Sequence, residues 1–347
     1  MKKKKVLLLF LCGLFLFLCS CGNQEEPTAA DTPTPTATPE STPTPEPTPV
    51  IFNPDFVVPD SSKRPVAVMI DNQGDRVLPQ GGIAQAQLVY EILTEYNITR
   101  YMAVFWDTLP EMVGPVRSSR HYFLDYVLEH DAIYTHAGGS TYAYRDIPKL
   151  KIQNIDYQVH SSAFWDLTKD INNWQDSYTS RERIEKFVSD KKYREESKVS
   201  FHFSYHDEFI VPDGTDATDV FIQFSSGNDS TCGYIYDENE KVYLRSRIGK
   251  VHIDRNTEEQ IKTTNIIVLK ISSPLIEGDA YGRRNLLNIG KGEGYYITGG
   301  KAIPIEWSKS ARDAQTQYTT ENGKPLVLNR GQTWIEVVPK LEYLTMK

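Results

Sequence analysis

Cysteine is scarce in this sequence, which has four in 347 residues. Three of them, Cys12, Cys19 and Cys21, lie in the first 21 positions, and Cys232 alone remains in the rest of the chain. A single cysteine cannot form an intramolecular bridge, so this long remainder has no disulfide framework. It is long enough to be held together by an ordinary hydrophobic core.

A hydrophobic run long enough to span a bilayer, about 20 residues, is also missing. The apolar run at residues 6–18 is shorter and follows four lysines. A basic start, a short apolar stretch and a small residue before a break predict a signal peptide over residues 1–20. The break, Leu18-Cys19-Ser20-Cys21, resembles the lipobox of bacterial lipoproteins, so Cys21 is predicted to be lipidated. An uncleaved membrane anchor is the alternative.

Positive charge is in deficit, with 38 Lys and Arg against 46 Asp and Glu and a net charge of −8. Loss of the four lysines at residues 2–5 with a signal peptide would change this to −12. Such a chain repels phosphate backbones and anionic lipid surfaces, so no nucleic-acid partner is predicted. Attachment to the membrane is predicted through the lipid instead, which places the protein outside the cytoplasm, anchored to the cell membrane.

Residues 21–50 consist mostly of Thr, Pro, Glu and Ala. Proline at nearly alternate positions fixes φ and removes backbone donors, which excludes helix and sheet. After the lipidated cysteine we therefore predict a semi-rigid stalk, extended at about 3.1 Å per residue.

The pattern from residue 62 to residue 210 alternates between strands and helices. Short apolar runs predict strands at residues 65–70, 98–106 and 132–136. Helical spacing of apolar residues, together with a capping box of Thr179 and Glu182, predicts helices at residues 83–96, 118–130 and 180–192. This alternation predicts an N-terminal layered α/β domain with a mixed sheet.

Pro212-Asp213-Gly214 ends this pattern, and the rest of the chain has the character of strands separated by turns. Hairpin connections are predicted at residues 237–240, 299–300 and 329–332. We therefore expect an α+β chain in which residues 215–340 form a mostly antiparallel, β-rich C-terminal domain. Its core should be separate from that of the first domain.

Residues 114–120, GPVRSSR, place two arginines around two serines just before an apolar run. Arg117, Ser118, Ser119 and Arg120 therefore predict an anion site at the N-terminus of a helix, where backbone amides are free. A guanidinium binds a carboxylate or a phosphate through two parallel hydrogen bonds. In the alternative, both arginines pair with internal acids such as Glu91, Glu95 or Asp125.

Residues 136–140, HAGGS, follow a predicted strand. Gly138 and Gly139 allow backbone amides to approach a ligand closely. His136 is a candidate general base and Ser140 a candidate nucleophile, although the spacing differs from that of a Gly-x-Ser-x-Gly elbow. A tight turn with a hydrogen-bonded histidine is the alternative.

Asp71 ends the first predicted strand, at the edge where open α/β sheets bind ligands. If neighbouring strands are parallel there, Asp71, Arg117 and His136 converge on one cleft. A carboxylate that only caps the turn is the alternative. Most of the tryptophans of this half, Trp106, Trp165 and Trp174, should be core, but some can offer a platform for sugar rings.

Signatures of cofactors and metals are missing as well. Residues 290–294, GKGEG, lack the Lys-Ser/Thr pair of a P-loop. The histidines His202, His206 and His252 supply no compact set of the three or four ligands that zinc needs. Neither a cofactor nor a metal is predicted.

Four blocks in order, RPVAVMIDN, GPVRSSR, DAIYTHAGGS and GQTWIEVVP, resemble the YerB-like family of bacterial lipoproteins. The likeness runs from about residue 64 to residue 339. It implies an α+β N-terminal domain, a β-rich C-terminal domain and a location in the cell envelope, but no particular chemistry.

These patterns together favour a lipid-anchored binding or scaffold protein of the cell envelope, whose partner is a cell-wall fragment or another envelope protein. The rival hypothesis is an envelope hydrolase or transferase that acts on an anionic wall substrate with Asp71, Glu91 or His136. Side-chain burial separates the two, because a catalytic group must be reachable from a cleft, whereas a structural one is enclosed and paired.

Overall fold

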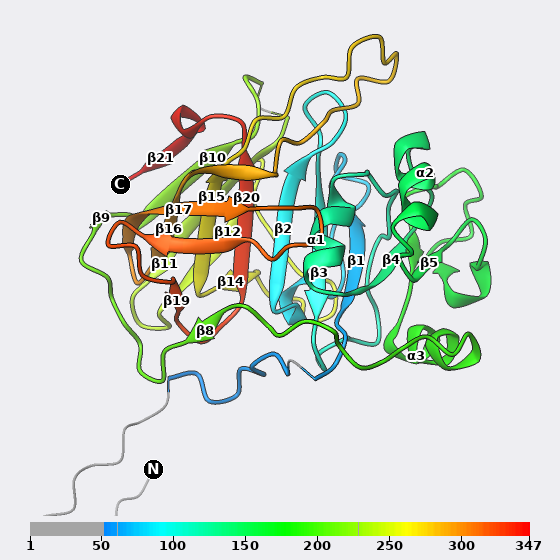
Figure 1. Cartoon of the computed structure of the whole chain (residues 1–347), viewed down its shortest axis with the longest axis horizontal. Helices are drawn as coiled ribbons and strands as arrows, with labels where there is room; N and C mark the ends of the chain where they lie inside the picture. The colour runs from blue at the N-terminus through cyan, green and yellow to red at the C-terminus, as the bar shows by residue number, and fades with distance from the viewer. Residues whose placement is uncertain (1–51, 61, 228) are drawn as a thin grey trace, which may run out of the picture. The chain divides into compact units, whose positions relative to one another are not determined.

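The computed structural model describes residues 52–60, 62–227 and 229–347 (Figure 1). The predicted signal peptide, the predicted lipidation site Cys21 and the predicted stalk all lie outside these residues. Within the described ranges, no helix has the length and apolarity needed to cross a membrane.

One large mixed sheet of 11 strands runs through the described part of the chain. The order across it is β18 (Gln317–Thr320), β17 (Lys301–Lys309), β16 (Gly290–Thr298), β15 (Asn265–Lys270), β20 (Thr333–Val338), β2 (Leu88–Leu93), β3 (Thr99–Phe105), β1 (Val66–Asp71), β4 (Ile133–His136) and β5 (Asn154–Asp156), and β9 (Thr215–Asp216) pairs with β17. β1 runs antiparallel to β3 and parallel to β4.

β20 joins the two halves of the chain inside this sheet. Its Trp334 is in register with Val89 of β2 on one side and with Ile266 of β15 on the other, and both pairings are parallel. Every residue of β20 is buried, as expected for a parallel strand that is covered on both faces. The prediction of separate cores in residues 62–210 and 215–340 is therefore wrong. The local sequence of a buried strand does not determine which strand it pairs with.

A second, antiparallel sheet of six strands belongs to the C-terminal half. It contains β13 (Lys250–Val251), β12 (Val242–Arg247), β11 (Thr231–Asp237), β10 (Asp219–Gln223), β21 (Leu344–Met346) and β14 (Lys262–Thr263). The mostly antiparallel, β-rich character predicted for this half is thus present, within an α+β chain. Smaller pairs are β8 (Ser204–Tyr205) with β19 (Val327–Leu328) and β6 (Trp165–Asp166) with β7 (Ser177–Tyr178).

Two of the three predicted hairpins are confirmed. The hairpin predicted at residues 237–240 is the turn at residues 238–241 between β11 and β12, and residues 299–300 join β16 to β17; both strand pairs are antiparallel. The hairpin predicted at residues 329–332 is wrong, because this turn connects β19 to β20 and the two strands pair with different partners.

The described residues contain three α-helices, α1 (Phe123–Glu129), α2 (Thr141–Lys149) and α3 (Arg181–Asp190), and short 3-10 turns η1 (Ile83–Gln85), η2 (Ser161–Ala163) and η3 (Leu341–Tyr343). α3 confirms the helix predicted at residues 180–192. Its N-cap is Ser180, whose Oγ accepts from the Arg183 N–H at 3.3 Å, whereas the predicted cap Thr179 donates its hydroxyl to the Ala163 carbonyl.

The helix predicted at residues 83–96 is wrong, since this segment forms η1 followed by strand β2. All residues of β2 are buried, on both faces of the sheet. A continuous apolar run of this kind satisfies helical spacing as well as strand spacing, so periodicity alone does not separate the two.

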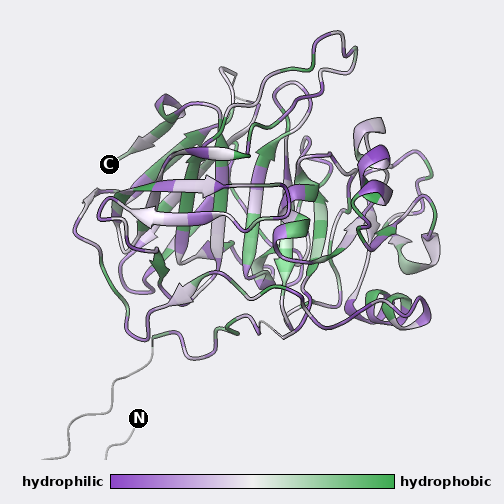
Figure 2. Cartoon of the chain, in the orientation of Figure 1, coloured by the Kyte–Doolittle hydropathy of each residue, from purple (hydrophilic) through white to green (hydrophobic). Residues whose placement is uncertain are grey.

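Both faces of the large sheet are covered at its central strands β2, β3 and β20. Alternate residues of β1 belong to different apolar clusters, Val68 and Ile70 to one and Ala67 and Met69 to the other. The first cluster also contains residues of β10, β11 and β12, so the second sheet packs on that face, while the second contains the inner side of α1. Figure 2 shows the apolar character of these central strands. β1 ends at Asp71, beside the loop whose Arg117 N–H bonds the Met69 carbonyl.

Candidate functional site

Asp71, the last residue of β1, has a fully buried side chain at one end of the large sheet. Its Oδ1 accepts from the backbone N–H of Gln73 at 3.1 Å, and its Oδ2 accepts from Gln175 Nε2 at 3.1 Å. Arg117 Nε lies 3.1 Å from the same Oδ2. The carboxylate therefore holds the turn after β1 and also anchors one side of Arg117.

The guanidinium of Arg117 is only partly used by the fold. Its carbon lies 4.0 Å from the centre of the Trp174 ring, and that residue is 53% exposed. The side chain of Arg117 is itself 21% exposed, and no acceptor among the described residues bonds its two terminal nitrogens. Burial, opposed by the charge of Asp71, lowers the pKa of Arg117. Arg117 thus keeps free donors beside an exposed aromatic ring.

Two further arginines share the carboxylate of Glu95 next to Arg117. Arg120 Nε contacts Glu95 Oε1, and Arg100 Nη2 lies 3.7 Å from Oε2. Burial, and after it the charge of Arg120, lowers the pKa of Arg100 to about 10. Burial alone would raise the pKa of Glu95, but the bond from Arg120 and the charge of Arg100 lower it. Three guanidiniums face the carboxylates of Asp71 and Glu95, which leaves an excess of positive charge.

Both arginines pair with internal acids, as the alternative interpretation supposed, Arg117 with Asp71 and Arg120 with Glu95. Glu95 is the partner of Arg120, but Asp125 pairs with Arg312 at 2.6 Å and Glu91 pairs with Arg245. Arg120 also donates Nη1 to the carbonyl of Ser119 at 2.7 Å. Arg120 therefore has more of its guanidinium nitrogens bonded within the fold than Arg117 has.

The helix predicted from residue 118 begins at Phe123, so residues 114–120 form a loop. The N–H of Arg117 donates to the Met69 carbonyl at 2.8 Å, and the N–H of Ser119 donates to the Gly138 carbonyl at 2.9 Å. The buried Ser119 hydroxyl accepts from Tyr134 OH at 2.8 Å. The prediction of free amides at a helix N-terminus is wrong for these positions, because the loop uses its donors against β1 and the turn after β4.

His136 and Ser140 are enclosed and bonded inside the fold. His136 Nδ1 lies 2.8 Å from the Gly138 carbonyl and Nε2 lies 2.9 Å from Asn154 Nδ2. Burial lowers the pKa of His136, against the opposing charge of Asp156. Ser140 caps α2 and accepts from the backbone at 3.1 Å, and no hydrogen bond among the described residues joins it to His136. This is the geometry of a tight turn.

The parallel pairing of β1 with β4 meets the condition for Asp71, Arg117 and His136 to converge. The structure brings Asp71 and Arg117 together, whereas both ring nitrogens of His136 contact other groups, the Gly138 carbonyl and Asn154. Gly138 adopts φ +77°, which favours glycine, and a Cβ there would lie 3.5 Å from Ser118 Oγ. Ser118, Gly138 and Gly139 are partly exposed and border the Arg117 loop.

Glu91 belongs to a different, interior cluster between the two sheets. Its Oε1 accepts from Asn72 Nδ2 at 3.0 Å and from Thr99 Oγ1 at 2.6 Å, and its Oε2 accepts from Arg245 of β12. Arg245 also donates Nε to Tyr234 OH at 3.0 Å. All of these side chains are buried, so the cluster is part of the core.

Glu336 of β20 lies in register with Glu91, which places two buried carboxyl groups side by side. Burial, and then the charge of Glu91, raises the pKa of Glu336 to about 8. Ligand atoms of Glu91, Glu336 and Cys232 lie within 4.8 Å of one another, a spacing that suits a metal ion. Arg245 already supplies positive charge to this group, so we assign no metal to it.

Sequence reasoning missed Arg100, Gln175, Arg245 and Glu336. Arg100 faces Asp71 across β3 and β1, a register that the local pattern does not contain. Trp174 was only one of several possible sugar platforms, and its stacking on Arg117 depends on the loop between β6 and β7. An exposed aromatic near an arginine is a signal that only the folded chain provides.

Comparisons with known proteins point to one family. Domain profiles described as "Protein of unknown function (DUF3048) N-terminal domain" and as its C-terminal domain match residues 57–194 and 220–335. These two matches divide the sequence close to the predicted boundary, although the strands of both halves share one sheet.

A curated relative, "Putative lipoprotein YerB" of Bacillus subtilis (strain 168), is 29% identical and covers 98% of this chain and 97% of its own. The crystal structure of the YerB protein from Bacillus subtilis matches with a TM-score of 0.72 at 29% identity, over 83% of this chain and 94% of that one. Similarity in sequence and in structure thus extends through both halves.

Proposed function

The chain belongs to the YerB-like family that the two DUF3048 domains define, and from this premise we propose that it is a lipid-anchored binding module of the cell envelope. The name of the relative supports a lipid anchor, and Leu18-Cys19-Ser20-Cys21 supports Cys21 as its site. The anchor would hold the domain on the outer side of the cell membrane, with residues 21–50 as the spacer.

The proposed ligand is a cell-wall fragment that carries a carboxylate or phosphate, bound at Arg117. The observation that carries this proposal is the unused edge of the Arg117 guanidinium, which stacks on the exposed Trp174 while Asp71 fixes its other side. A planar guanidinium with free nitrogens suits a bidentate anion. A flat aromatic ring beside it suits the apolar face of a sugar.

Neighbouring groups have supporting parts in this proposal. Arg100 and Arg120 would add positive potential without leaving Glu95. Ser118, with Gly138 and Gly139 beside it, would border the ligand from the turn after β4. Asp71, Glu91 and His136 are at most 1% exposed, so a substrate cannot reach them. We therefore propose that the protein binds a ligand at Arg117 and that these three groups do not act as catalysts.

Titration of the purified protein with carboxylated muropeptides, followed by calorimetry, tests the proposal. Arg117→Lys should weaken binding at least tenfold, because charged hydrogen bonds contribute about 1.5–3 kcal/mol each and lysine lacks the fork. Fragments whose carboxylates are amidated should bind wild type and variant equally weakly.

Arg283 provides a matched control. Its side chain is 20% exposed, its Nη1 lies 3.2 Å from Asp279, and it lies 4.4 Å from the ring centre of Tyr281. Arg283→Lys should leave muropeptide binding unchanged. Equal losses in both variants, or a full-strength complex with Arg117→Lys, would show that Arg117 does not bind the fragment.

A further inference from the structure

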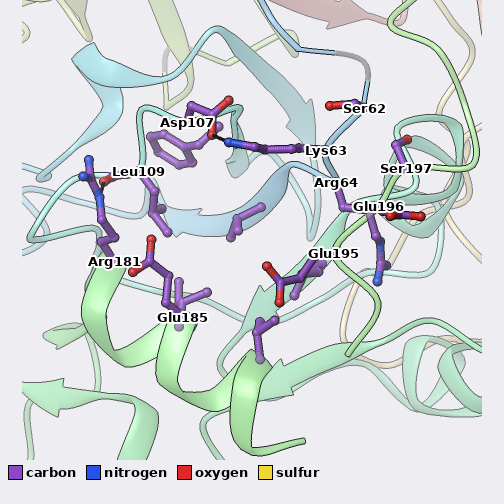
Figure 3. A pocket seen from close by; sticks show the side chains of 15 residues that line it. Ser62, Lys63, Arg64, Asp107, Leu109, Arg181, Glu185, Glu195, Glu196 and Ser197 are labelled. Atoms are coloured by element: carbon purple, nitrogen blue, oxygen red, sulfur yellow. Dashed lines mark hydrogen bonds and ion pairs between the residues drawn. The ribbon is translucent and has the colours of Figure 1, made fainter. Parts of the chain in front are cut away.

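A cavity of about 760 Å³ opens at the other end of β1, beside Val66 (Figure 3). Small-molecule sites have volumes of roughly 300–1,000 Å³, so this one is large enough for a ligand. Its walls come from the beginning of β1, the end of β3, α3 and the segment at residues 195–197. None of the candidate residues of the Arg117 site lines it.

One part of the cavity wall is apolar. Its lining includes the strand and loop residues Val66, Phe105, Leu109 and Ile133 and, from α3, Ile184 and Val188. α3 therefore turns one apolar stripe toward the sheet without closing the space completely. Such a surface suits an aliphatic group better than a fully hydrated one.

Two of the cations at the cavity are already paired. Lys63 Nζ lies 2.8 Å from Asp107 Oδ1, a contact that Figure 3 shows across one side of the opening. Arg64 is almost fully buried and donates to the carbonyls of Asp131, Ala132 and Arg194. Neither side chain leaves a positive charge free for a ligand.

Apart from Asp107, three carboxylates line the cavity, and all three belong to exposed residues. Glu185, Glu195 and Glu196 line it, and none of their side chains has a hydrogen bond or an ion pair with another described residue. Figure 3 shows the carboxylates of Glu185, from α3, and Glu195, from the opposite wall, directed into the same space. Arg181 is the one lining cation that has no acidic partner among the described residues, and its Nε donates to the Leu109 carbonyl.

We propose that this cavity binds a short peptide segment that combines an aliphatic side chain with a primary ammonium group. The aliphatic part would contact Val66, Ile133 and Val188, and the ammonium would lie between Glu185 and Glu195. An ammonium donates up to three hydrogen bonds, so it can satisfy two carboxylates at once. The site has the opposite charge preference to the Arg117 site and does not depend on it.

The probe is acetyl-leucyl-lysine amide, titrated into the purified protein and followed by two-dimensional amide NMR. Saturable shifts are expected at Glu185, Val188 and Glu195. Acetyl-leucyl-glutamine amide, which keeps the apolar part and lacks the charge, should bind at least fivefold more weakly. Glu185→Gln/Glu195→Gln should weaken the lysine probe at least fivefold and leave the glutamine probe unchanged.

Glu182→Gln/Glu277→Gln is the matched control, since it removes two exposed carboxylates outside the cavity. It should bind the lysine probe as wild type does, and so should Arg117→Lys. Glu185→Gln and Glu195→Gln are also made singly. Thermal unfolding of every variant shows whether weaker binding comes from a loss of folding. The proposal is overturned by the absence of saturable shifts at the cavity, by equal affinity for both probes, or by equal losses in the cavity variant and the control.

Discussion

Two clusters of charged side chains contain the consecutive residues Asp71 and Asn72. The arginines of the two clusters differ in how many of their nitrogens are bonded within the fold. Asn72 bonds Glu91 in the interior cluster, whereas the buried Asp71 pairs with the partly exposed Arg117 in what we call the surface cluster. In the interior, every nitrogen of the Arg245 guanidinium has a partner. At the surface, the terminal nitrogens of Arg117 have none among the described residues. All three nitrogens of the Arg245 guanidinium are therefore bonded within the fold, whereas the two terminal nitrogens of Arg117 remain available to a ligand.

The difference indicates what each cluster does. A buried ion with all of its hydrogen bonds made fixes how the two sheets pack, and removal of a partner leaves an uncompensated charge. A partly exposed guanidinium with unused donors contributes less to stability and more to recognition. Stability measurements and binding measurements should therefore separate the two clusters.

The largest expected effect is on Arg245. Arg245→Met leaves the carboxylate of Glu91 buried without its cation, and breaking such a pair costs about 3–5 kcal/mol. The free energy of unfolding, measured with urea, should fall by about that amount. Glu91→Leu/Arg245→Met should recover much of the loss, since both charges are then absent. A loss below about 1 kcal/mol for Arg245→Met would mean that the interior cluster does not fix the packing.

The second effect is a pH dependence of the free energy of unfolding that arises from Glu336 of the interior cluster. The pKa of Glu336 is raised in the folded protein to about 8 from its ordinary 4.5, by burial and by Glu91. A group whose pKa is raised on folding stabilises the fold fully below its unfolded pKa and loses that contribution as pH rises. Stability should therefore decline between about pH 4.5 and about pH 8 on account of Glu336.

Glu336→Gln should remove this decline, so the variant gains on wild type as pH rises across that window. Glu293→Gln, which changes an exposed carboxylate bonded to Lys270, should preserve the wild-type slope. Urea unfolding at intervals from pH 5 to pH 8.5 measures the difference. Parallel curves for wild type and Glu336→Gln would contradict a proton on Glu336 in the folded state.

The smallest expected effect is on the stability of the surface cluster. Arg117→Lys keeps a positive charge beside Asp71, and Gln175 continues to bond the same carboxylate. Its free energy of unfolding should fall by less than about 1 kcal/mol. A loss as large as that of Arg245→Met would place Arg117 with the interior residues and remove the distinction between the clusters.

Local sequence predicted the strands at residues 65–70, 98–106 and 132–136, because each is a short apolar run between turns. It did not predict the pairing of β20, or the ion pair of Glu91 with Arg245, which are 154 residues apart in sequence. The candidate site shows the same division between local patterns and long-range contacts. Asp71 and Arg117 were identified from local motifs, whereas Arg100 and the stacking of Trp174 depend on register and loop path.

The most direct test of the central claim is to observe the arginine side chains during ligand binding. Nitrogen NMR of the guanidinium groups, recorded while carboxylated muropeptide is added, reports on Arg117 and Arg245 in one sample. A saturable shift is expected for Arg117, and none is expected for Arg245 or for the matched control Arg283. A complex that forms without any change at Arg117 would contradict the proposed binding at Arg117.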